Sequence, residues 1–342
     1  MNAIKHSLVA AAALLAVQGA AFAQSSVTVY GKVDLGLVLD SGNAAGKSVR
    51  LSSGVSGGSR LGFKGVEDLG DGNKASFLLE TGYCADSAAG APNFCTGGQF
   101  MGRQVFGQLS GAFGAVSGGR QYGLGYLNLS TVDPFGTGYA GKANNLIDAS
   151  GVRIDNSVHY VTPTFGGFSA AAELGFGEAT GDWRKSRETG ASATYASGPA
   201  YAGLSYYGLN NANGVGAARR NFTLGGTYDL GVVKLHALVQ KSNGHPTGGA
   251  TLDVLDLMGG ATVPLAGGSV LASYIHHDDK GVLNHDASQW GLGYVYPLSK
   301  RTSLYTAYAH ISNRNGATFT VGNATEGGTG HNAFDFGCVH NF

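Results

Sequence analysis

The chain has 342 residues, of which 43% are hydrophobic and only 13% are charged, with 22 basic side chains against 22 acidic ones. It contains 58 glycines. An average soluble domain carries about 25% charged residues and about 7% glycine. Half the usual charge and more than twice the usual glycine argue against an ordinary cytosolic enzyme, a nucleic-acid binder with a basic face and a charge-rich disordered segment. No stretch after residue 23 holds the roughly 18 apolar residues that a membrane-spanning helix needs, which excludes a helical membrane protein.

Residues 1–23 resemble a secretory signal peptide. Lys5 and His6 form a short basic start, residues 8–17 are apolar, and Ala21-Phe22-Ala23 fits a small-x-small cleavage site. The alternative is a genuine N-terminal helix. Removal of this segment leaves a single domain, residues 24–342, and takes Lys5 away, so the net charge is close to −1 and offers no attraction for nucleic acid.

Three cysteines remain in a chain that is expected to reach an oxidising compartment. Cys84 and Cys95 lie eleven positions apart in a segment rich in Gly, Ala, Asn and Pro, which favours a local disulfide. Cys338 is left over and is expected to face lipid as a small apolar side chain. The spacing forms no CxxC pair, and we expect neither a metal nor a cofactor.

A period of two recurs along the chain and predicts β-strands. In residues 27–39 one parity reads Val, Val, Gly, Val, Leu, Leu, Leu, while the other carries Thr28, Lys32 and Asp34. Successive strand side chains point to opposite faces, so such a strand has one apolar face and one polar face. The same alternation appears in residues 168–176, 222–229 and 233–240. Phe334, Phe336, Cys338, His340 and Phe342 share one parity at the chain end, which is typical of a lipid-facing closing strand.

Short and long connections alternate between the expected strands. Short turns are predicted at 68–73, 110–112, 163–167, 197–199, 229–231, 264–268 and 297–301. Longer polar connections are predicted at 40–46, 84–98, 123–151, 178–184, 210–218, 243–250, 277–285 and 313–330. This arrangement predicts an all-β fold: a 16-stranded antiparallel transmembrane β-barrel with short periplasmic turns and long outer loops. A closed barrel of about sixteen strands encloses a water-filled lumen.

Several motifs resemble those of the Gram-negative general porins. They are VYGK at 29–32, SRLGFKGVEDLG at 59–70, GGRQY at 118–122, DPFG at 133–136 and the terminal Phe342. The resemblance covers essentially the whole chain after residue 23. It implies an outer-membrane homotrimer of sixteen-stranded barrels, each with its third loop folded inward. It also implies passive diffusion of small hydrophilic solutes and ions, no enzymatic activity, and contact with outer-membrane lipid and lipopolysaccharide.

The resemblance also implies which residues narrow the pore. Basic residues are expected on the wall, and carboxylates are expected on the inward loop opposite them. This arrangement would set up a transverse field and a weak preference for anions. The expected residues are Lys32, Arg60, Arg103, Arg120 and Arg153 on the wall, with Asp133 and the less certain Asp148 on the loop.

Other functions are open alternatives at this point. A substrate-specific channel and a surface adhesin share the same architecture. A hydrolase would need a nucleophile beside a base, but Ser157 and His159 are two apart on one strand, about 7 Å, too far for that hydrogen bond. The letters of residues 136–141 fit GxGxxG without the strand-to-helix context of a dinucleotide site. Residues 276–279 and His285 could hold a metal.

Overall fold

The computed structural model describes residues 26–44, 46–87 and 95–342. Residues 1–23 therefore lie outside the described part, and their assignment as a signal peptide stays a prediction. Almost every element is a β-strand, and all strands belong to one sheet. Within the described part no helix is long and apolar enough to cross a membrane, which leaves crossing by strands untouched.

The strands follow one another in chain order. They are β1 (Ser26–Asn43), β2 (Gly46–Ser53), β3 (Arg60–Gly70), β4 (Asn73–Gly82), β5 (Gln104–Gly111), β6 (Gly114–Tyr122), β7 (Arg153–Val161), β8 (Phe168–Gly175), β9 (Glu188–Ser197), β10 (Ala200–Asn210), β11 (Ala217–Asp229), β12 (Lys234–Gly244), β13 (Leu252–Leu265), β14 (Gly268–Asp279), β15 (Ala287–Pro297), β16 (Thr302–Asn313) and β17 (Asn332–Asn341). A helix, α2 (Leu124–Val132), and a short 3-10 turn, η2 (Ala143–Asn145), lie between β6 and β7.

The sheet closes on itself as a sixteen-stranded antiparallel barrel. β2 and β3 both pair with β1: residues 35–43 of β1 face β2, and residues 26–32 face β3. The two are halves of one interrupted strand, so the seventeen segments make sixteen strands. β17 pairs with the other edge of β1 and completes the ring. Closure leaves no free edge whose backbone groups would be unsatisfied in lipid, and it confirms the predicted fold class.

The connections also agree with the prediction. All seven predicted short turns join neighbouring strands at one rim, and the longer connections lie at the other rim. One connection differs from expectation. The segment predicted as a longer loop at 40–46 is largely strand: β1 runs to Asn43, β2 begins at Gly46, and these two residues pair. The register of the pairing shifts once, between Asp40 and Asn43.

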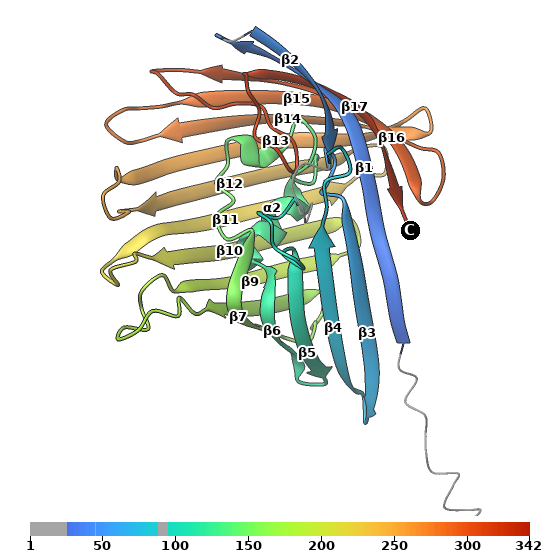
Figure 1. The fold of residues 1–342 in the computed structure, drawn as a ribbon, viewed down its shortest axis with the longest axis vertical. Helices are drawn as coiled ribbons and strands as arrows, with labels where there is room; N and C mark the ends of the chain where they lie inside the picture. The colour runs from blue at the N-terminus through green and yellow to red at the C-terminus, as the bar shows by residue number, and fades with distance from the viewer. Residues whose placement is uncertain (1–25, 45, 88–94) are drawn as a thin grey trace, which may run out of the picture.

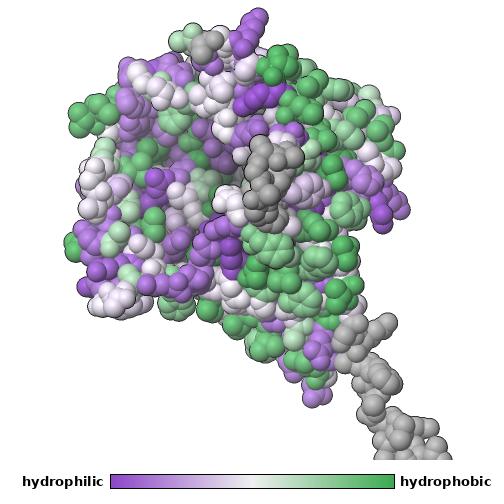
Figure 2. All heavy atoms as spheres, viewed as in Figure 1, coloured by the Kyte–Doolittle hydropathy of each residue, from purple (hydrophilic) through white to green (hydrophobic). Residues whose placement is uncertain are grey.

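The two faces of the strands have the predicted chemistry. Val27, Val29, Leu37 and Leu39 are exposed on the outside, whereas Asp34 on the other parity is fully buried inside. Figure 2 shows hydrophobic residues gathered over the strands at the lower right, while hydrophilic residues dominate the left, where the long loops lie. The outside of the barrel therefore suits lipid.

The third loop, residues 123–152, folds into the barrel. Helix α2 lies within the ring of strands (Figure 1) and packs against β9 to β12. Its buried Leu129 and Val132 join a hydrophobic cluster with Leu238 and Met258 from the wall. These wall residues are apolar on the inward face because the helix, and not water, covers them. The predicted inward fold of this loop is therefore correct.

The outer face of the barrel gives a direct test of membrane insertion. Leu224 in β11 and Leu230 in the following turn are each 53% exposed. Leu224 lies near the middle of the apolar band, so we expect Leu224→Arg to destabilise the folded barrel by about 2–4 kcal/mol. Leu230 lies near the interface, so Leu230→Arg should cost only about 0–1 kcal/mol. Unfolding in urea from lipid vesicles measures both. Equal effects of the two substitutions would contradict this placement of the membrane.

Candidate pore constriction

A cavity of about 340 Å³ lies between the barrel wall and the third loop. We call it the waist cavity. It is lined by Lys32, Ser56, Gly57, Gly58, Arg60, Arg103, Tyr122, Tyr126, Leu127, Ser130, Gly136, Thr137, Asn144, Val152, Arg153 and Ala324. Four of the seven residues expected from the sequence, Lys32, Arg60, Arg103 and Arg153, meet here.

Glu80 on β4 organises two of these cations. Its carboxylate accepts a hydrogen bond from Arg103 Nε at 2.7 Å and lies 3.8 Å from the guanidinium of Arg60. The Tyr30 hydroxyl donates to the same carboxylate at 2.9 Å. The side chain of Glu80 is only 3% exposed, so it faces its partners and not the cavity. It holds the arginines in place and compensates one of the positive charges.

Tyr122 holds Arg153 and also contacts Arg103. Arg153 and Arg103 both donate to its hydroxyl, Arg153 at 2.9 Å. The Arg153 guanidinium also lies 4.7 Å from the ring centroid, a cation–π contact. Tyr126 stacks against Tyr122 at 5.2 Å. The guanidinium groups are thus fixed at the wall although they carry like charges.

The loop side of the waist cavity differs from the sequence expectation. The lining residues that the third loop contributes carry no charge; they are Tyr126, Leu127, Ser130, Gly136, Thr137, Asn144 and Val152. No carboxylate is among the described residues lining the cavity. The charged side chains that line the waist cavity are therefore all cations, and the expected loop carboxylates are not among them.

Asp133 does not reach the waist cavity because the loop uses it internally. Its carboxylate is 4% exposed and accepts hydrogen bonds from the backbone N–H groups of Phe135 at 3.0 Å, Thr137 at 2.8 Å and Ala143 at 2.9 Å. Burial raises the pKa of Asp133 to about 6, although these hydrogen bonds oppose the shift. Burial lowers the pKa of nearby Lys142 to about 8. Asp133 is a structural residue that shapes the loop.

The raised pKa of Asp133 makes barrel stability depend on pH. Because the folded form holds the proton more tightly, this group stabilises the fold fully below about pH 4, and the contribution is lost as the pH rises through about 6. We expect the urea midpoint to fall between pH 4 and pH 6, and the fall to be smaller in Asp133→Asn. An identical pH profile for the wild type and the variant would contradict this role.

Asp148 and Arg120 also lie elsewhere. Asp148 forms an ion pair with Arg219 and accepts a hydrogen bond from Asn221 at 2.9 Å, which ties the end of the third loop to β11. Arg120 pairs with Asp155, and its Nε donates to the carbonyl of Gly102 at 2.8 Å. It lies where the pairing of β6 with β7 shifts register and is not among the described residues that line the waist cavity, so its assignment to the pore stays a prediction.

The cysteines and the histidine segment can be placed as well. Cys84 and Cys95 form a disulfide with their Cα atoms 5.2 Å apart, and Cys338 is free and exposed. His277 bonds inward to Asp256, whereas Asp278 pairs with Lys280. In the described ranges no group of three or more His, Cys, Asp or Glu residues could hold a metal.

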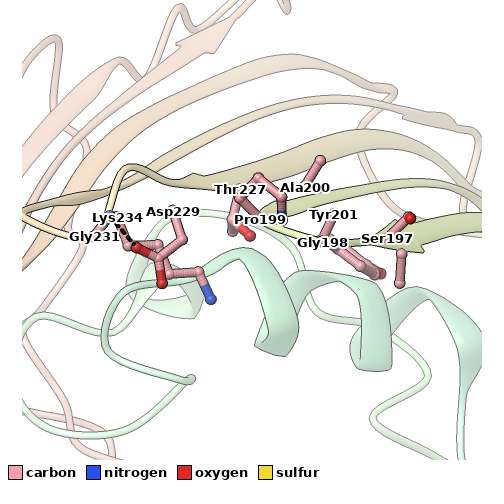
Figure 3. A pocket seen from close by; sticks show the side chains of 10 residues that line it. Ser197, Gly198, Pro199, Ala200, Tyr201, Thr227, Asp229, Gly231 and Lys234 are labelled. Atoms are coloured by element: carbon pink, nitrogen blue, oxygen red, sulfur yellow. Dashed lines mark hydrogen bonds between the residues drawn. The ribbon is translucent and has the colours of Figure 1, made fainter.

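A wider groove of about 660 Å³ lies at the rim of the short turns. The turns after β9 and β11 line it, beside helix α2 (Figure 3). Asp229 and Lys234 are register partners and give it one charge of each sign. The groove therefore carries no net charge from these two residues.

Three parts of the waist cavity were missed from the sequence. Glu80 and Tyr122 act through contacts between residues far apart in the chain, which no local sequence motif indicates. The break between β2 and β3 is held by Asp34, which accepts hydrogen bonds from the backbone N–H groups of Ser56 at 2.7 Å and Gly57 at 2.9 Å. A Cβ at Gly58 would come within 2.9 Å of the Arg103 guanidinium. The glycines in this break could have signalled the close approach of large side chains.

A closed barrel with an apolar exterior and a narrowed, cation-lined interior defines a transmembrane channel. Comparison with known proteins identifies the family: the model of the Gram-negative porins matches residues 10–316. Outer membrane porin protein 32 of Delftia acidovorans is 37% identical, with 92% of each chain covered. A Bordetella pertussis outer membrane porin is 33% identical and covers 91% of this chain and 95% of its own length.

Solved structures agree with this family. The anion-selective porin of Comamonas acidovorans has a TM-score of 0.78 at 31% identity, covering 93% of this chain and all of that one. The trimer form of Vibrio cholerae OmpT, at 17% identity, has a TM-score of 0.69 over 93% of this chain and 99% of its own, and shows the shared fold. The chain belongs to the Gram-negative porin family. It is a channel protein of the outer membrane and not an enzyme.

Proposed function

We propose that this porin is a general diffusion channel that prefers anions, with Lys32, Arg60, Arg103 and Arg153 as the residues that set the preference. The observation that carries the proposal is the charge of the waist cavity, where four cationic side chains meet no lining carboxylate. Glu80 offsets one charge from behind, which leaves the waist net positive. The similar Comamonas acidovorans porin is described as anion-selective.

The mechanism follows from electrostatics in a narrow aqueous passage. Low-dielectric walls focus the field of the four cations into the waist cavity and raise the local concentration of anions. Fixed guanidinium groups replace part of the hydration shell of a passing anion, whereas cations meet a barrier. Several adjacent donors let the anion move from one donor to the next, so that no single donor binds it too tightly for release.

Planar-bilayer recording tests the proposal. Under a salt gradient, the reversal potential of the refolded protein should take the sign of an anion-preferring channel. The preference should weaken as salt rises, because the screening length falls from about 10 Å at 0.1 M to about 3 Å at 1 M. A cation-preferring reversal potential would refute the proposal. If conductance saturates as the concentration of one particular sugar or acid rises, a substrate-specific channel is favoured instead.

We further propose that residues 1–23 are removed on export and that residues 24–342 assemble as a homotrimer in contact with lipid and lipopolysaccharide. The outer face of β5 and β6 supports association. Gly107 and Gly118 are exposed there, and a Cβ added at either position would meet nothing within 4 Å, which leaves room for close approach of a second chain. Conductance steps in groups of three, together with cross-linked trimers, test this assembly.

A further inference from the structure

A second connection enters the barrel beside the third loop. The eighth loop, residues 314–331, joins β16 to β17 at the rim of long loops. Its middle is buried: Val321 is 1% exposed and Asn323 is 2% exposed. Val321 belongs to the same hydrophobic cluster as the third loop. A loop that only covered the outer surface would not bury these side chains.

The buried part of the eighth loop is bonded to the break between β2 and β3. The N–H of Ala324 donates to the carbonyl of Val55 at 3.2 Å, and the hydroxyl of Thr325 donates to the carbonyl of Ser53 at 2.6 Å. The same Val55 carbonyl accepts a hydrogen bond from the N–H of Tyr139 in the third loop at 2.8 Å. One carbonyl therefore joins three inner segments.

The eighth loop is also bonded directly to the third loop. The amine of Lys142 donates to the carbonyl of Asn323, and the N–H of Gly322 donates to the side-chain oxygen of Asn145 at 3.0 Å. The side chain of Asn323 accepts hydrogen bonds from the N–H groups of Thr325 and Glu326, at 3.1 and 2.9 Å, and fixes the local turn. Hydrogen bonds therefore hold segment 321–326 to the break between β2 and β3 on one side and to the third loop on the other, and the Asn323 side chain fixes its own turn.

This bonding brings one residue of the eighth loop into the waist cavity. Ala324 lines it together with Lys32 and Arg60. We propose that position 324 modulates the selectivity that the four cations set, because a small uncharged residue there leaves these cations unopposed. The inference rests on the proposed function, because it assumes that ions pass through the waist cavity.

A single charge at position 324 tests the inference. Ala324→Asp should lower the anion-to-cation permeability ratio by about fivefold at low salt, the effect of one unit charge at close range in water. Thr318→Asp is the matched control: it adds the same charge to an exposed position of the same loop that does not line the cavity, and the ratio should stay within about twofold. Arg60→Ala serves as a reference for the waist itself.

A second variant covers the case in which Ala324→Asp fails to fold. Ala324→Cys in a Cys338→Ser background folds with a small neutral residue and can then be labelled with a sulfonate-bearing thiol reagent, since Cys84 and Cys95 are bonded to each other. Labelling should reduce conductance and anion preference together. If Arg60→Ala lowers the ratio while charge at 324 leaves it unchanged, the inference is wrong and the proposed function stands. If neither changes the ratio, both are overturned.

Discussion

Replacing Arg60 and Arg153 together with glutamate is expected to reverse the selectivity of the channel from anions to cations. The double substitution changes the four lining cations into two cations and two carboxylates, with Glu80 adding a further negative charge behind them. Each unit charge close to a passing ion contributes about 1 kcal/mol even at the dielectric constant of water, roughly fivefold in permeability. The measurement is the sign of the reversal potential under a salt gradient at about 0.1 M.

The matched control applies the same charge change outside the waist cavity. Arg184 is exposed in an outer loop and paired with Asp182, and Arg301 is exposed in the turn before β16. Their double replacement by glutamate should leave the sign of the reversal potential unchanged, because solvent and salt screen charges at the rims. If both doubles shift the reversal potential equally, net charge and not the waist sets the selectivity.

Glu80→Ala is expected to destabilise the barrel by about 3 kcal/mol, the lower end of the cost of breaking a buried ion pair. Arg103 is only 8% exposed and would lose its carboxylate partner, while Arg60 would lose a nearby negative charge. The waist would then hold its four cations without the compensation that Glu80 supplies. A lower urea midpoint in vesicles measures the loss, and the anion preference of the molecules that do fold should rise.

A second substitution separates charge from packing. In the double variant Glu80→Ala with Arg103→Met, the unpaired charge is gone and most of the stability should return, since removing both members of a buried pair is often nearly neutral. Glu80→Gln keeps the shape of the side chain and should still cost stability. If Glu80→Gln is as stable as the wild type, the ion pair does not hold the waist together.

The faces of the strands could be predicted from the sequence because alternation is a local property. The parity of residues 27–39 correctly separates Leu37 outside from Asp34 inside. The same rule gives no answer for Arg120, because the pairing of β6 with β7 shifts register between Gly119 and Gln121 and interrupts the alternation there. Strand number followed from counting turns, because each turn carries its own Gly, Asp, Asn or Pro signal.

The interior could be predicted only in part, because its contacts join residues far apart in the chain. Asp133 stands in a motif typical of the inward loop, but the motif does not reveal that backbone N–H groups surround the carboxylate. Glu80 lies in a strand whose sequence shows only the ordinary alternation of apolar and polar residues. Its role depends on Arg103, 23 residues away. The eighth loop is a glycine-rich polar stretch whose composition is typical of a surface loop.

The carbonyl of Val55 receives hydrogen bonds from Tyr139 and from Ala324, so the wall and both inner loops meet at one atom. None of the three can shift without disturbing the other two. We expect a constriction braced in this way to resist widening when a bulky solute enters it. Its flux should drop abruptly with molecular diameter instead of declining gradually, and nutrients slightly above the limit would need a different route into the cell.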